Sequence, residues 1–167
     1  MSRHIPQQQG IEGLRPTTRY ITTHDATSGK SIFVSPQEPL YFVFRTNDFG
    51  VARLYGVQHL PAAHLAKDTD LQGYLSDKKE EHPTSFARVG DELTIPEGVN
   101  FTQLDMAPAA YIGMHRTVSI DFVAVVEGEV VVELDSGESR VLRRGVSLEK
   151  RWLGMYSWVE ERANLSV

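Results

Sequence analysis

The sequence predicts an all-β protein, built as an antiparallel sandwich or barrel, and three observations support this. Residues 121–126, Asp-Phe-Val-Ala-Val-Val, form an apolar run typical of a buried strand. Two further strand-like runs follow it, at residues 130–134 and 139–142. Turns that each contain a glycine separate or close these runs, at residues 127–129, 135–138 and 143–145. Short strands divided by turns at this spacing are typical of antiparallel sandwiches and barrels.

The N-terminal half adds shorter elements of the same kind. Residues 19–23, 31–34 and 40–44 are rich in β-branched and aromatic side chains, which favour strands. Residues 101–106 also have β character, with Phe101 and Gln103 on one face of a strand and Thr102, Leu104 and Met106 on the other. Residues 58–84 are charged and carry no strand pattern. We expect them to form a long polar insertion at the surface, with one helical turn.

Large apolar residues recur at steps of three and four near the C-terminal end. They are Leu148, Trp152, Met155, Tyr156 and Val159. This spacing predicts a helix within residues 148–167, because it gathers these side chains on one helical face. Either the helix packs on the barrel, or a face around Trp152 and Trp158 binds a partner protein. The chain then divides into a loose N-terminal arm at 1–16, a barrel at 17–147 and this C-terminal segment at 148–167.

Composition narrows the classes of function. A chain of 167 residues fits one domain, and a net charge of -5 argues against a nucleic-acid partner. Cysteine is absent, which excludes disulfides and thiolate chemistry. No apolar run approaches the ~20 residues of a membrane span, and the N-terminus has no leader-like apolar region, so we expect a cytoplasmic protein without a membrane partner. No glycine-rich dinucleotide or phosphate-binding loop is present, so no nucleotide cofactor is expected.

The segment from His115 to Asp121 holds the candidate catalytic residues. If this segment is one continuous strand, His115, Thr117 and Ser119 share a face, and Asp121 joins them. On the inward face of a small barrel, His115 and Asp121 can act as a general acid/base pair, with the carboxylate fixing the imidazole tautomer. Thr117 and Ser119 would then contact the substrate. The alternative is that these side chains only hydrogen-bond one another.

Other candidates are weaker. Tyr41 and Arg45 lie on the same face of an N-terminal strand and would contact substrate at the barrel mouth, although they equally suit an ordinary edge strand. The remaining histidines do not have the spacing of metal ligands, and we expect them at the surface.

The run His115-Arg116-Thr117-Val118-Ser119-Ile120-Asp121, followed after six intervening residues by Gly128-Glu129, resembles the first cupin motif. In that motif His115 matches the first histidine, Asp121 the acidic residue and Gly128 the final glycine. The opening Arg19-Tyr20-Ile21-Thr22-Thr23-His24-Asp25 is also similar to a subgroup of small fungal and bacterial cupins. The resemblance covers about residues 19–145 and implies a jelly-roll barrel, the double-stranded β-helix.

The resemblance also implies a metal site, from which this sequence departs. A cupin metal has three histidines and one carboxylate, and it is a divalent ion such as Fe, Mn, Ni or Zn. The motif here supplies His115 and Asp121, whereas Thr117 occupies the position of the second histidine. No histidine follows His115, so the second cupin motif is absent. We therefore expect a degenerate metal site, since hydroxyls are weak ligands for these ions.

For function, the resemblance implies an oxidoreductase that tailors a small organic metabolite, because several fungal members belong to polyketide gene clusters. Two alternatives remain open. One is a metal-independent dehydratase or isomerase with His115 as its base, and the other is a non-catalytic cupin that binds a metabolite. Cupins commonly pair through their sheets, so the resemblance further implies a homodimer.

Overall fold

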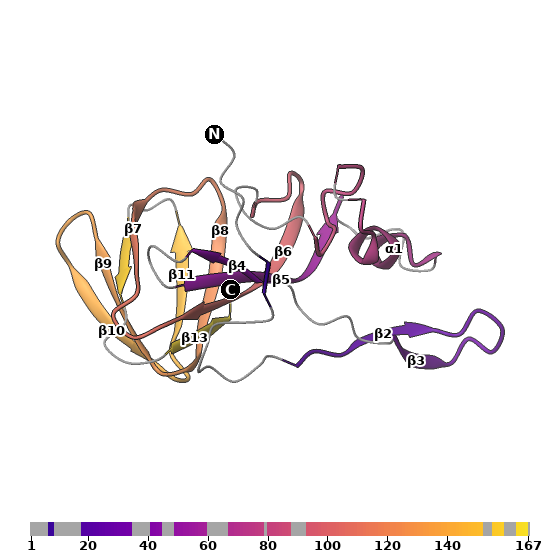
Figure 1. Cartoon of the computed structure of the whole chain (residues 1–167), viewed down its shortest axis with the longest axis horizontal. Coiled ribbons are helices and arrows are strands. Elements are labelled where there is room, and N and C mark those ends of the chain that lie inside the picture. The colour runs from indigo at the N-terminus through magenta and orange to yellow at the C-terminus, as the bar shows by residue number, and fades with distance from the viewer. Residues whose placement is uncertain are drawn as a thin grey trace.

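Runs of β-branched and aromatic residues form antiparallel strands in the structure, a computed structural model (Figure 1). It describes residues 18–34, 49–59, 67–78, 80–87 and 93–149 in full, and only the backbone pairing of residues 7–8, 41–44, 150–151, 155–158 and 163–166. Each strand pairing among these residues is antiparallel. The predicted all-β, antiparallel architecture is therefore confirmed.

Two sheets make up most of the described chain. The large sheet has the order β1 (Gln7–Gln8), β4 (Tyr41–Phe44), β5 (Phe49–Gln58), β6 (Gly98–Met106), β13 (Ala163–Ser166), β8 (Ile120–Glu127) and β11 (Ser147–Arg151). The small sheet has the order β10 (Ser139–Arg143), β9 (Glu129–Leu134), β12 (Met155–Trp158) and β7 (Tyr111–His115). Two predicted turns are found, since Gly128 and Gly137 have positive φ angles of 81° and 86° that favour glycine.

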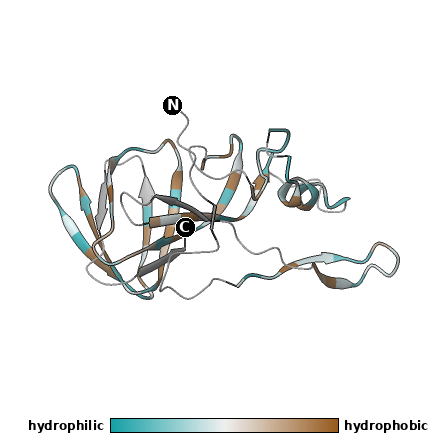
Figure 2. Ribbon diagram, viewed as in Figure 1, coloured by the Kyte–Doolittle hydropathy of each residue, from teal (hydrophilic) through white to brown (hydrophobic). Residues whose placement is uncertain are grey.

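The core joins the two sheets. Met106 and Val125 from the large sheet pack with Val130, Val132 and Leu142 from the small one, and all five are buried. Complete burial of one such side chain contributes roughly 1.5–3 kcal/mol. Figure 2 shows hydrophobic residues alternating with hydrophilic ones along the strands, as expected when one face of each strand is buried.

The helix predicted within residues 148–167 is wrong. The described parts of this segment form three strands, β11, β12 and β13. β12 lies between β9 and β7, and β13 lies between β6 and β8, so each satisfies the backbone groups of two neighbouring strands. Hydrogen bonds to these distant strands outweigh the local preference for a helix. The spacing of apolar residues along the chain reports only that local preference, so it does not reveal the long-range pairing. Trp152 lies outside the described residues, and Trp158 belongs to β12.

The polar insertion carries a helix that is more buried than expected. α1 (Thr69–Leu75) contacts β5, and its buried residues include Leu71 and Tyr74. The Tyr74 ring lies 4.8 Å from the Tyr55 ring and 6.2 Å from the Phe86 ring. The insertion therefore contributes a small core of its own, although its composition predicts a surface loop. No helix among the described residues has the length and apolarity required to cross a bilayer.

The remaining element is a hairpin. β2 (Ile21–His24) and β3 (Ser31–Val34) pair only with each other among the described strands. In Figure 1 the hairpin extends away from the two sheets, on the same side as α1. Its turn is closed by Asp25, which accepts a hydrogen bond from the Ser28 backbone amide at 2.7 Å.

Candidate active site

The predicted catalytic segment crosses from one sheet to the other. His115 is the last residue of β7 in the small sheet, whereas Asp121 is the second residue of β8 in the large sheet. Residues 116–119 form the connection between these strands and are not in a strand. The prediction that His115, Thr117, Ser119 and Asp121 share the face of one strand is therefore wrong, because the chain leaves the first sheet at His115.

The His115 ring is oriented by its own strand. Its Nδ1 atom lies 2.9 Å from the carbonyl oxygen of Gly113. A carbonyl can only accept a hydrogen bond, so Nδ1 carries the proton and a neutral ring keeps its lone pair on Nε2. The acceptor that fixes the tautomer is thus the Gly113 carbonyl rather than the Asp121 carboxylate. His115 is half-buried, which suits a base that a small molecule can reach.

Ser119 and Asp121 are brought together by a hydrogen bond rather than by a shared strand face. The Ser119 hydroxyl donates a hydrogen bond of 2.6 Å to Asp121 Oδ1. A short bond of this kind is typical of a hydroxyl donating to an ionised carboxylate. The bond holds the Asp121 side chain at the start of β8, where the connection from His115 enters the large sheet.

Thr117 lies between His115 and Ser119 in sequence, and its hydroxyl forms no comparable hydrogen bond. Its hydroxyl oxygen is buried and has no hydrogen-bond partner among the described residues. A buried hydroxyl without a partner costs about 1–3 kcal/mol, so a polar ligand that reached it would gain this hydrogen bond. The other two predicted substrate contacts are not tested. Tyr41 begins β4 with its side chain undescribed, and Arg45 lies outside the described residues.

The described donor set does not fit a cupin metal site. No group of three or more histidine, aspartate or glutamate side chains that could hold a metal ion is found in residues 18–34, 49–59, 67–78, 80–87 and 93–149. The motif itself offers one imidazole and one carboxylate, with the Thr117 hydroxyl where the second imidazole would be. These are too few and too weak for the tetrahedral or octahedral sites of divalent ions.

Completing this donor set gives a direct test of the site. Replacing Thr117 by histidine is expected to tighten Zn²⁺ binding to the full chain about tenfold or more, because it adds a second imidazole in the short connection that joins His115 to Asp121. Isothermal titration with Zn²⁺ measures the change. The gain should disappear when His115→Ala is added. Equal affinity in Thr117→His and the original chain would show that the 116–119 connection keeps these side chains apart.

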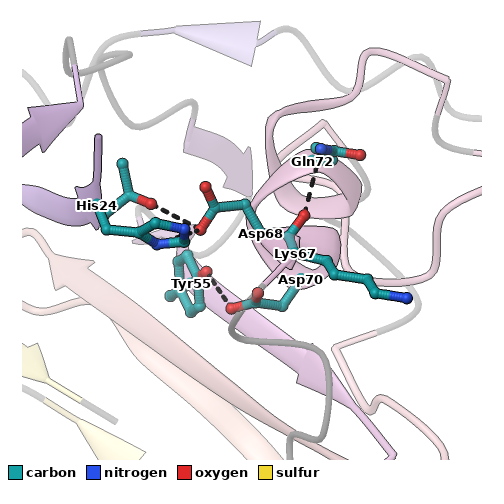
Figure 3. Close-up of polar contacts among 7 residues, drawn as sticks. His24, Tyr55, Lys67, Asp68, Asp70 and Gln72 are labelled. Carbon is teal, nitrogen blue, oxygen red and sulfur yellow. Dashed lines mark hydrogen bonds and ion pairs between the residues drawn. The ribbon is translucent and has the colours of Figure 1, made fainter. Parts of the chain in front are cut away.

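A second polar cluster, absent from the predicted site, lies between the hairpin, β5 and α1 (Figure 3). The Thr23 hydroxyl donates to Asp68 Oδ1 at 2.6 Å, and His24 Nδ1 lies 3.8 Å from the same oxygen. The Tyr55 hydroxyl donates to Asp70 Oδ2 at 2.7 Å. Burial raises the pKa of Tyr55, and the hydrogen bond to Asp70 raises it further. Tyr55 therefore acts as a donor that ties β5 to α1, and it is poorly suited to be a catalytic base.

Two arginines complete the neighbouring core. Arg19 lies over the Tyr74 ring, 4.9 Å from its centroid, and donates hydrogen bonds to the Tyr74 hydroxyl and the Leu54 carbonyl. Arg53 is almost completely buried and donates from Nε to Asn100 Oδ1 at 2.9 Å. Its Nη1 donates to the carbonyl oxygens of Pro83 and Ser85 at 2.7 and 3.0 Å. Burial raises the pKa of Tyr74, although the adjacent Arg19 opposes the shift.

Sequence reasoning did not find this second cluster or the arginine contacts beside it, because the residues that make contact are far apart in the chain. Arg53 and Ser85 are 32 positions apart, and Arg19 and Tyr74 are 55 apart. The only local signal is the pair of acidic residues at the start of α1, Asp68 and Asp70, which is ordinary for a helix N-terminus. We interpret this cluster as the structural connection between the hairpin, the helix and the large sheet.

Comparison with known proteins identifies relatives of this chain. No model of a known protein family matches the chain. The chain is 35% identical over 140 residues to the cupin-domain-containing oxidoreductase virC of Hypocrea virens, which covers 83% of this chain and 65% of that protein. It is 33% identical over 149 residues to the cupin-domain-containing oxidoreductase srdB of Neurospora crassa, with 87% of this chain and 67% of that protein covered.

A third relative has a different kind of name. The phomopsin biosynthesis cluster protein C' of Diaporthe leptostromiformis is 34% identical over 135 residues, which are 79% of this chain and 65% of that protein. The chain thus spans about two thirds of the length of the curated relatives it matches, 65–67% for these three. Among solved structures, the chain is similar to a cupin superfamily protein from Desulfitobacterium hafniense, with a TM-score of 0.37 and 12% identity over 40% of this chain and 62% of that chain.

Proposed function

The chain belongs to the family of cupin-domain-containing oxidoreductases, and on that premise we propose that it is a tailoring oxidoreductase of secondary-metabolite biosynthesis. In this proposal its substrate is a small organic molecule, an aromatic or an aldehyde of polyketide origin. Support for the pathway comes from a relative named for a biosynthesis cluster, the phomopsin protein. We place the activity in the cytoplasm, where a chain without cysteine needs no disulfides.

The observation that carries the proposal is the fixed tautomer of His115. Oxidation of an alcohol, phenol or aldehyde hydrate removes protons and electrons, and in this proposal the electrons pass to a separate electron acceptor that binds with the substrate while a base takes a proton. His115 Nε2 has a lone pair for that proton, because Nδ1–H is committed to the Gly113 carbonyl 2.9 Å away. A half-buried imidazole with a free lone pair is a suitable general base. The described residues thus supply the proton-accepting half of the reaction.

Asp121 has a supporting electrostatic role in this proposal. The carboxylate is held by the Ser119 hydroxyl at 2.6 Å, at the other end of the short connection from His115. We assign this negative charge the role of stabilising the positive charge that develops on His115 when Nε2 accepts a proton. The unpartnered Thr117 hydroxyl lies between His115 and Asp121 in sequence and supplies a hydrogen bond to a polar substrate group.

The same geometry favours a second candidate, a metal-independent dehydratase or isomerase. Both reactions need only proton transfers, and the described residues offer a base with a fixed tautomer but no three-ligand metal group. In this case His115 Nε2 removes a proton from carbon next to a carbonyl, and the imidazolium returns it to another atom of the substrate or to the departing hydroxyl.

A test of these functions uses the purified full chain with a panel of phenols, benzaldehydes and hydroxyketones. Each compound is incubated with and without an electron acceptor, and products are identified by mass spectrometry. We expect His115→Ala to lower turnover about 10²–10⁴-fold, as expected for loss of a general base. Arg116→Ala is the matched control, because this neighbour is exposed and its guanidinium forms an ion pair with Asp135. Its turnover should be unchanged.

The outcomes separate the candidates. Turnover that requires an electron acceptor supports the oxidoreductase. Loss of water or migration of a double bond without an acceptor supports the second candidate. Saturable binding of a panel compound without any product would replace both by a binding role, and unchanged turnover in His115→Ala would remove this residue from the mechanism.

A further inference from the structure

The Asp68 side chain joins the β2–β3 hairpin to the N-terminal end of α1 (Figure 3). Its Oδ1 atom accepts a hydrogen bond of 2.6 Å from the Thr23 hydroxyl, and His24 Nδ1 lies 3.8 Å from the same oxygen. Among the described strands β2 and β3 pair only with each other, so the hairpin depends on side-chain contacts for its position. An isolated two-stranded hairpin is only marginally stable in water, so the contacts of Asp68 affect how firmly it is held.

Asp68 is also the N-cap residue of α1, and it does not cap the helix. An N-cap carboxylate ordinarily accepts a hydrogen bond from the amide of the second or third helical residue, which here are Asp70 and Leu71. The Asp68 side chain makes no such bond to α1 in the described chain. Its backbone has φ 51° and ψ 26°, in the left-handed region that is unfavourable for a residue with a Cβ atom. Asp68 thus gives up a helix cap and adopts a strained backbone while it holds the hairpin.

We infer that Asp68 is a two-position latch, and that protonation of His24 selects the position. In the closed position, which the structure shows, the carboxylate holds Thr23 and His24. In the open position it caps the amide of Asp70 or Leu71, and the hairpin loses this contact with α1. Capping requires an extended backbone at the N-cap residue, so the two positions exclude each other. The relief of backbone strain and the gain of the cap offset the loss of the contacts with the hairpin.

Protonation of His24 favours the closed position. A protonated ring has a charge opposite to that of the Asp68 carboxylate, 3.8 Å away, and the two side chains are only 39% and 31% exposed. When the ring loses its proton this attraction is lost, whereas the hydrogen bond from Thr23 remains. Histidine side chains ordinarily change charge between pH 5 and 8. The closed position is therefore most stable at the acid end of this range and loses stability as the pH rises.

The other charged or titratable groups around His24 leave this switch to the histidine. Asp25, its neighbour in the hairpin, has its pKa held below the usual range by hydrogen bonds within its own turn. Asp70 accepts a hydrogen bond from the Tyr55 hydroxyl, and burial raises the pKa of Tyr55. The Lys67 side chain points away from His24 in Figure 3. Carboxylates, lysine and tyrosine ordinarily keep their charge between pH 5 and 8, so histidine is the residue type here whose charge changes.

The other end of β2 has contacts that do not depend on this proton. Arg19 donates hydrogen bonds to the Leu54 carbonyl and the Tyr74 hydroxyl, and its guanidinium lies over the Tyr74 ring. Neither of these partners is a histidine or a carboxylate, so the contacts persist when Asp68 changes position. The hairpin therefore turns about its Arg19 end when its His24 end is released.

Hydrogen exchange measured by mass spectrometry on the full chain tests the dependence on pH. Exchange of the hairpin amides, residues 21–34, is compared at pH 5.5 and pH 8 after division by the intrinsic rates of the unfolded peptide. We expect about twofold to fivefold greater protection at pH 5.5, the range for a partly exposed ion pair. The β9–β10 hairpin, residues 129–143, is the internal control, because it is also a two-stranded hairpin and contains no histidine. Its protection should not change between the two pH values.

The His24→Gln variant separates a switch from a merely structural contact. Glutamine is neutral at both pH values, so this variant should show the pH 8 protection of the original chain at pH 5.5 as well. A loss of protection of equal size at both pH values would assign His24 a structural role and overturn the switch. Equal protection at the two pH values in the original chain would overturn it too.

Nuclear magnetic resonance of the α1 amides reports the position of the carboxylate itself. We expect the amide proton of Asp70 or Leu71 to move downfield as the pH rises from 5.5 to 8, because it gains a hydrogen bond from Asp68. Thr23→Val removes the bond of 2.6 Å, so its amide proton should already be downfield at pH 5.5. Asp68→Gly, which tolerates the left-handed backbone but has no carboxylate, should show no movement. Amide protons that stay fixed in the original chain would contradict the two-position latch.

Discussion

Replacement of Arg53 by methionine is expected to lower the free energy of unfolding by about 3–5 kcal/mol. Methionine has a similar length but cannot donate a hydrogen bond. The change removes the donor from Asn100 Oδ1 and from the carbonyls of Pro83 and Ser85, at a residue that is 1% exposed. Each buried acceptor that loses its partner costs about 1–3 kcal/mol. Urea denaturation followed by circular dichroism measures the effect.

The matched control is Arg143→Met. Arg143 also donates a hydrogen bond of 2.9 Å, to Glu129, but its side chain is 62% exposed. Water replaces the lost partner there, so the cost should stay below about 1 kcal/mol. If the two variants lost similar stability, the buried polar network around Arg53 would not be important for the fold.

Replacement of Gly98 by alanine is expected to destabilise the chain by about 2–4 kcal/mol. Gly98 begins β6 and pairs with Gln58 at the end of β5. A Cβ atom there would lie 2.3 Å from the Val57 carbonyl oxygen and 2.6 Å from Ile95 Cγ2. The first of these atoms belongs to the backbone, so the clash can be relieved only by separating the two strands.

Gly113→Ala is the control for this prediction. It also lies in a strand, and apart from its two chain neighbours no described residue has an atom within 4 Å of the added Cβ. Alanine also reduces the entropy of the unfolded chain, so this variant should keep its stability or gain up to about 1 kcal/mol. Thermal unfolding of both variants under the same conditions tests the contrast. Equal melting temperatures would show that β5 and β6 can move apart at Gly98 without cost.

The local elements of the fold were predictable from the sequence, and the long-range ones were not. The strands at residues 121–126, 130–134 and 139–142 follow one another through tight turns, so composition and turn residues suffice to identify them. The C-terminal strands instead insert between strands made much earlier, as β13 does between β6 and β8. Their sequence has no strong alternation, because their stability depends on hydrogen bonds to distant partners rather than on local preference.

The candidate site likewise has local features that the sequence predicts and long-range features that it does not. The resemblance located His115 and Asp121, and the pairing of Ser119 with Asp121 follows from their two-residue separation. The passage of the chain from the small sheet to the large one after His115 could not be predicted, because the motif contains no glycine or proline to mark the break. The orienting role of the Gly113 carbonyl was equally invisible, since every residue has a carbonyl and only the backbone path places this one beside Nδ1.

The positions of β12 and β13 have a consequence for synthesis of the chain on the ribosome. β8 and β6 hydrogen-bond to the same late strand, β13, and β9 and β7 likewise share β12. Neither sheet can be completed until residues 155–166 have been translated and have left the exit tunnel. Before then four strands present open edges, which are templates for aggregation. A chaperone that binds the nascent chain would therefore be needed most until residues 155–166 have emerged.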